Sequence, residues 1–147
     1  MNQPFPWIED YENHRKEYGP SCLAGYAYLK MGNGEMAGYH LNADLSRLLD
    51  EMRYPSEDVQ TGYIYLHLAR VYSMLGNSAK TLEYIAKLTD YQTIDSRMIN
   101  ELKHWPSYDL VSDTPEFGKM MDQLENKYRK EHDKVAKLIK DYGIDPS

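Results

Sequence analysis

The sequence predicts an all-α protein, and three observations lead to that prediction. Apolar residues recur at helical steps of three and four along most of the chain, whereas alternating strand patterns are scarce. Glycine, proline and capping residues divide this pattern into segments of helical length. The chain has 147 residues, of which 41% are hydrophobic, so it is long enough to bury one core.

The first half of the chain contains four expected helices after an N-terminal arm or short helix (residues 1–19). Pro20 suits a first helical position, because the N–H that proline lacks has no helical partner there. Gly32 and Gly76 suit the left-handed residue that follows a helix. We therefore expect helices over residues 20–31, 34–52, 57–75 and 78–90.

The second half contains a short helix with an irregular tail and then one long helix. The short helix and tail occupy residues 95–114, with irregular chain over 104–113. The run Thr114-Pro115-Glu116 places a cap, a first-turn proline and an early acid in the order that begins a helix. We expect a long capping helix over 115–141, a C-terminal tail over 142–147, and a helical domain over 20–141.

One stretch of sequence recurs 44 residues later, since residues 28–33 (YLKMGN) match residues 72–77 (YSMLGN). Small residues, Gly25 and Ala69, precede the two tyrosines by three positions. A small residue on one helix lets an antiparallel neighbour approach closely, and the glycine makes the turn between them. The spacing predicts two similar helix pairs.

The second of these units resembles the tetratricopeptide repeat (TPR) family. Residues 75–88 are similar to the turn and second helix of a TPR. The first-helix signature positions hold Tyr65, Leu68, Ala69 and Tyr72. Residues 105–117 resemble the tail that often follows a last repeat. The resemblance implies a TPR-like array of antiparallel helix pairs, with units of about 20–52 and 57–90 and a long C-terminal capping helix.

The chain departs from the family pattern in its period and at two normally small positions. The family repeats about every 34 residues, so the offset of 44 implies an elongated second helix in the first unit or an elongated start to the next. Thr81 and Asp44 stand where smaller residues are usual. About three repeats normally make a stable stack, so two repeats suggest a homo-oligomer or an N-terminal neighbour.

The resemblance places six residues on the concave groove of such an array: Tyr26, Lys30, Tyr63, Leu66, Arg70 and Met74. Tyrosines beside one or two cations suit a peptide ligand. We therefore expect a scaffold or adaptor that binds a protein or peptide partner, or that self-associates. The alternative is a regulatory domain that senses a small anionic molecule, with Arg70 as its anchor. A groove filled by the chain's own C-terminal segment also remains open.

The last expected helix carries a second apolar surface. Its apolar residues follow near-heptad steps that are interrupted by Glu131, and they are Phe117, Met121, Leu124, Tyr128, Val135, Leu138 and Tyr142. The first half of this stripe is expected to cover the core. The second half is highly charged and is expected to project or to pack only in part.

Composition argues against several other classes of function. A net charge of -6 and a pI near 5.3 disfavour nucleic-acid binding, which needs clustered positive charge. The sequence shows no signal-peptide pattern and no apolar run of membrane-spanning length. Acidic and basic residues are mixed along the last helix, which disfavours membrane-surface binding. A cytoplasmic location is therefore the expectation.

No catalytic, metal or cofactor site is expected. Cys22 is the single cysteine, which excludes an internal disulfide and a Cys-cluster zinc site. The five histidines show no metal-ligand spacing. Phosphate-binding glycine loops and nucleophile motifs are also missing from the sequence. The 14 tyrosines, against 2 Phe and 2 Trp, favour an architecture and a groove built from rings with a polar end.

Overall fold

The structure, a computed structural model, describes residues 21–54 and 61–144. All regular structure within these ranges is helical, which confirms the all-α prediction. The elements are α2 (Cys22–Lys30), α3 (Gly34–Arg53), α4 (Thr61–Met74), α5 (Ser78–Asp90), α6 (Ser96–His104), the 3-10 turn η1 (Pro106–Tyr108), α7 (Asp109–Ser112) and α8 (Pro115–Asp141).

The two turns that carry the repeated sequence have the same geometry. Gly32 and Gly76 adopt left-handed φ values of 75° and 81°, which glycine takes at little cost. The next residue caps the following helix in both cases, because the Asn33 and Asn77 side chains accept backbone N–H hydrogen bonds at 3.1 and 3.0 Å. The chain therefore makes two equivalent helix–turn–helix units.

Three expectations about the elements need correction or fall outside the described ranges. The segment expected to be irregular forms η1 and α7, because Pro106 begins a 3-10 turn that continues directly into a helical turn. Helix α2 begins at Cys22, two residues later than expected, after the cap Ser21, whose hydroxyl accepts the Ala24 N–H. Residues 1–20, the expected start of the third helix and residues 145–147 lie outside the described ranges.

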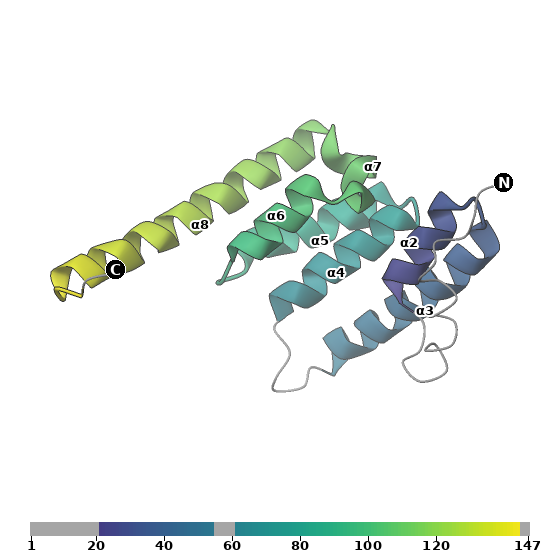
Figure 1. Ribbon diagram of the computed structural model, residues 1–147, viewed down its shortest axis with the longest axis horizontal. Coiled ribbons are helices and arrows are strands. Elements are labelled where there is room, and N and C mark those ends of the chain that lie inside the picture. The colour runs from purple at the N-terminus through teal and green to yellow at the C-terminus, as the bar shows by residue number, and fades with distance from the viewer. Residues whose placement is uncertain (1–20, 55–60, 145–147) are drawn as a thin grey trace.

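Consecutive helices lie side by side, with α2 on α3, α3 on α4 and α4 on α5 (Figure 1). Helix α2 approaches α3 closely at Gly25, where an added Cβ would lie 2.6 Å from the Leu41 Cγ. Helix α3 has 20 residues and α5 has 13. The offset of 44 residues therefore includes an elongated second helix in the first unit.

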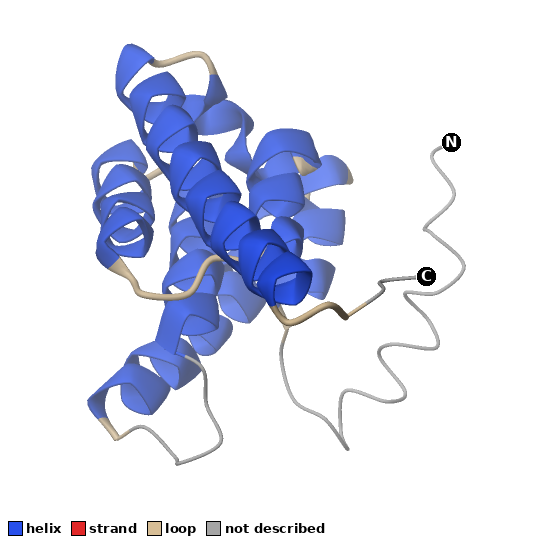
Figure 2. Cartoon of the chain, turned by 90° about the vertical axis from the view of Figure 1, so that its left-hand side faces the viewer, coloured by secondary structure: helices blue, strands red, loops and turns tan. Residues whose placement is uncertain are grey.

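Helix α4 lies at the centre of the core. Its most buried side chains are Ile64, Leu66, Leu68, Ala69 and Val71, all at 3% exposure or less. Elements α5, η1 and α7 pack against α4, and α8 packs across α5, α6 and α7 (Figure 2). Helix α8 buries only Phe117, Met121 and Leu124, and its remaining length projects beyond the other helices (Figure 1).

Candidate partner-binding groove

A cavity of about 420 Å³ lies where α2, α4 and the start of η1 meet. Its walls are mostly apolar, and its lining residues are Cys22, Leu23, Tyr26, Arg70, Met74, Trp105, Pro106 and Ser107. We call this the α2–α4 cavity. Three of the six residues expected in the groove, Tyr26, Arg70 and Met74, meet here from two helices that are separated by about one repeat.

The other three expected residues lie elsewhere. Lys30 holds its ammonium over the Tyr26 ring, 5.3 Å from the centroid, and lies at the exposed end of α2. The Tyr63 hydroxyl hydrogen-bonds with the Asp95 carboxylate, and the ring lines a separate depression between α4 and α6. These two side chains belong to the surroundings of the α2–α4 cavity and not to its walls.

Leu66 does not offer its side chain to a partner in the way the sequence predicted. It is 2% exposed and belongs to the main core. Tyr108, from η1, also reaches this position, since its hydroxyl lies 3.2 Å from the Leu66 backbone carbonyl oxygen. Residues 105–108, which we call the covering segment, therefore lie against α4 beside the expected groove.

A buried polar network ties this covering segment to α4. One Arg70 guanidinium nitrogen lies 2.6 Å from the Glu101 carboxylate, and both side chains are 12% exposed. The Tyr108 hydroxyl lies 3.1 Å from the other Glu101 oxygen. The Trp105 ring stacks over the guanidinium at 5.0 Å. Arg70 is therefore already paired, which disfavours its use as the anchor for a small anion.

Burial dominates the ionisation of this network. It raises the pKa of the Glu101 carboxyl group, although Arg70 and the Tyr108 hydroxyl act in the opposite direction. Burial also raises the pKa of Tyr108 well above its usual range, and the Glu101 charge adds to that rise. The network holds the covering segment in place through hydrogen bonds that water does not reach.

Two polar atoms at the cavity have no hydrogen-bond partner within the described part of the chain. They are the Ser107 hydroxyl oxygen and the Arg70 Nε, and both are shielded from solvent. Ser107 is 8% exposed. A buried polar group without a partner is costly, so these two atoms lower the stability of the packing around the cavity.

Cys22 also lines the cavity, but it is not an activated nucleophile. Burial raises the pKa of its thiol, and the nearby Asp44 carboxylate adds to that effect. His67 on α4 is held neutral, because burial and then Arg70 lower its pKa to about 4. Arg70 lowers the pKa of the Cys22 thiol by less than burial raises it, so the thiol contributes to the cavity as an apolar lining group.

Sequence reasoning did not place Trp105, Pro106 and Ser107 in the groove. The rings of Trp105 and Pro106 lie 31 or more positions from Met74 along the chain, and helical periodicity carries no information on contacts at that distance. The Trp-Pro pair was the available signal, because a large exposed aromatic residue before a proline turn is typical of contact surfaces.

Two further findings limit what the described residues can do. No group of three or more His, Cys, Asp or Glu side chains in residues 21–54 and 61–144 is placed to hold a metal ion. None of the helices in those ranges combines the length and the apolar character that crossing a lipid bilayer requires.

Comparison with known proteins gave no match to a family model, to a curated protein or to a solved structure.

Proposed function

We propose that this protein is a protein–protein interaction module with a TPR-like arrangement of its helix pairs, and that the α2–α4 cavity receives an apolar side chain of a peptide or protein partner. The observation that carries the proposal is the cavity itself. Its walls are mostly apolar, and two of its lining residues, Leu23 and Trp105, are exposed. This combination is typical of a site that binds one anchoring apolar side chain.

The rim of the cavity supports this proposal. Leu23 is 55% exposed and Trp105 is 46% exposed, although both are large and apolar. Both line the cavity, Leu23 from α2 and Trp105 from the residue before η1. Burying both against a partner removes apolar surface from water, which is the main favourable term in most association.

The repeated turns support the TPR-like arrangement. The glycine turns at Gly32 and Gly76 and their asparagine caps make two helix pairs of the same local geometry. The tight contact between Gly25 and Leu41 corresponds to the close helix approach that the repeat spacing predicts. In such an array the first helices of the pairs, α2 and α4, line the binding face.

A selection of peptides tests the proposal. A random peptide library is selected against the whole chain, and the enriched peptides are labelled and titrated by fluorescence anisotropy. Leu23→Glu places a charge at the apolar rim and is expected to weaken binding at least about tenfold. Leu110→Glu, on α7, is the matched control, because Leu110 is 45% exposed and does not line the cavity.

Two outcomes would count against this site. One is that no peptide is enriched above an unrelated helical protein. The other is that the enriched peptides bind Leu23→Glu as tightly as they bind the original chain. The small-anion alternative is tested by a thermal-shift screen with phosphates and dicarboxylates. A rise in melting temperature that disappears in Arg70→Gln would favour it.

A further inference from the structure

The distal half of α8, from Arg129 to Asp141, buries no side chain in the core. Its first half buries Phe117, Met121 and Leu124, and Lys127 donates to the Thr89 and Tyr91 carbonyl oxygens at the end of α5. Beyond this point nearly every residue of α8 is exposed. Figure 1 shows this part of the helix extending away from the rest of the molecule.

The exposed half continues the apolar face that the first half buries. Steps of three and four lead from Tyr128 through Glu131 to Val135, Leu138 and Tyr142, which all lie on one face of the helix. Val135 and Leu138 are 53% and 54% exposed, and Tyr142 is 78% exposed. A stripe of this kind is the surface through which two helices pair.

The charges on this half restrict what can cover it. From Arg129 to Asp141 the helix has five basic and three acidic residues, whereas the whole chain has a net charge of -6. The acidic residues Glu131, Asp133 and Asp141 are distributed along the segment, which disfavours a polyanion. In an antiparallel pairing the order of the charges also places Lys134, which pairs with Glu131 of its own chain, opposite Asp141 of the second copy.

We propose that the distal half of α8 pairs antiparallel with the same segment of a second copy of this chain. In the alignment with Val135 against Leu138 of the second copy, the apolar residues form the centre of the seam. Lys134 then faces Asp141 of the second copy, and this contact occurs twice by symmetry. Tyr142 brings its hydroxyl to the carboxylate of Glu131, the one charged residue in the stripe.

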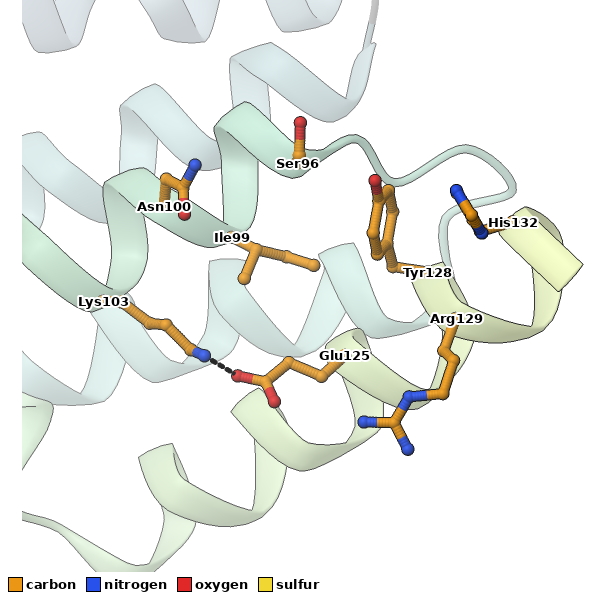
Figure 3. Close-up of a pocket in the computed structure, with 8 residues that line it drawn as sticks. All are labelled: Ser96, Ile99, Asn100, Lys103, Glu125, Tyr128, Arg129 and His132. Carbon is orange, nitrogen blue, oxygen red and sulfur yellow. Dashed lines mark ion pairs between the residues drawn. The ribbon is translucent and has the colours of Figure 1, made fainter. Parts of the chain in front are cut away.

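A cavity at the base of the projecting helix fits this arrangement. It has a volume of about 350 Å³ and lies between α6 and α8 (Figure 3). Ile99 and Tyr128 contribute its apolar lining, and the Lys103–Glu125 ion pair lies at one side (Figure 3). The same alignment brings Tyr142 of the second copy to the level of Glu131, next to Tyr128 and His132, which line this cavity.

The small contact area determines how tightly the two copies are expected to bind each other. The segment from Tyr128 to Asp141 is about 21 Å long at 1.5 Å per residue. A two-helix seam of this length lies at the low end of interface sizes, so the dimer is expected to dissociate in the micromolar range. This surface is separate from the α2–α4 cavity, and the proposal does not depend on peptide binding there.

Sedimentation velocity on the whole chain, from about 1 to about 500 μM, tests the proposal. The original chain is expected to change from monomer to dimer across this range, and Leu138→Glu is expected to stay monomeric. Lys137→Gln is the matched control, because it changes the charge by the same amount on the opposite face of the helix. A monomeric original chain, a dimeric Leu138→Glu or a monomeric Lys137→Gln would each overturn the proposal.

A charge exchange tests the antiparallel alignment. Lys134→Asp and Asp141→Lys each place like charges opposite one another, so each is expected to weaken the dimer about tenfold at low salt. The double variant restores both opposite-charge contacts and is expected to recover the original dissociation constant. Circular dichroism checks that helix content is unchanged. A double variant that is as weak as the single variants would refute this alignment.

Discussion

Two glycine-to-alanine substitutions, one on each helix of the first pair, are predicted to have opposite effects on stability. At Gly25 on α2 an added Cβ would lie 2.6 Å from the Leu41 Cγ, 2.7 Å from its Cδ2 and 3.4 Å from its backbone nitrogen. At Gly38 on α3 the nearest atom is the Asn42 Nδ2, at 3.9 Å. Gly25→Ala therefore meets a buried side chain, and Gly38→Ala meets open space.

The magnitudes follow from these distances. Replacing glycine by alanine inside a helix stabilises it by roughly 0.5–1 kcal/mol, because the unfolded chain loses less entropy on folding. Gly38→Ala receives this gain alone. Leu41 is 1% exposed and cannot move away without disturbing the core, and overpacking of this kind costs about 1–3 kcal/mol. We expect Gly25→Ala to be destabilised by about 1–2 kcal/mol overall.

Urea unfolding followed by circular dichroism measures both free energies under one set of conditions. The two variants are expected to differ by about 2 kcal/mol, which is well above the error of such a comparison. A Gly25→Ala variant as stable as Gly38→Ala would refute the close approach of α2 and α3. A destabilised Gly38→Ala would instead show that the exposed side of α3 is packed.

Two further predictions concern the buried polar groups. Tyr108→Phe removes the hydroxyl that lies beside Glu101 and the Leu66 carbonyl oxygen. It should lower the free energy of unfolding, measured in urea, by about 1.5–3 kcal/mol. An unchanged free energy of unfolding would contradict these hydrogen bonds. The folded pKa of His67, about 4, is below the ordinary value of 6.5, so only the unfolded chain binds a proton there between these values. Stability should therefore fall by about 1–2 kcal/mol from pH 7 to pH 5, and His67→Gln should show a smaller fall.

The helices could be predicted where local chemistry decides them. Gly32, Gly76 and the residues that follow them set the two turns through a left-handed residue and a side-chain cap, which are effects within one helical turn. Helix α8 likewise begins after Thr114, whose hydroxyl accepts the Phe117 N–H. The helical content of η1 and α7 was missed, because these short elements depend on packing against α4 and α5.

The groove could be predicted only in part, because some of its contacts join segments that are far apart in the sequence. Tyr26, Arg70 and Met74 share a cavity because α2 and α4 are the first helices of two similar pairs. Leu66 was expected on the same face of α4, but it is buried in the core, where Tyr108 reaches its carbonyl oxygen from 42 residues away. A resemblance to a repeat places residues within the repeat unit and gives no information on what a later segment covers.

The distal half of α8 buries no side chain in the core of its own chain, and this affects the stability of its helix. A helix of about 14 residues is only marginally stable in water when no tertiary contact supports it, because nucleation is unfavourable. Helix formation beyond Arg129 and any contact made by Val135 or Leu138 are therefore linked equilibria. Amide hydrogen exchange in this segment reports association directly, whereas exchange in α4 reports the opening of the core.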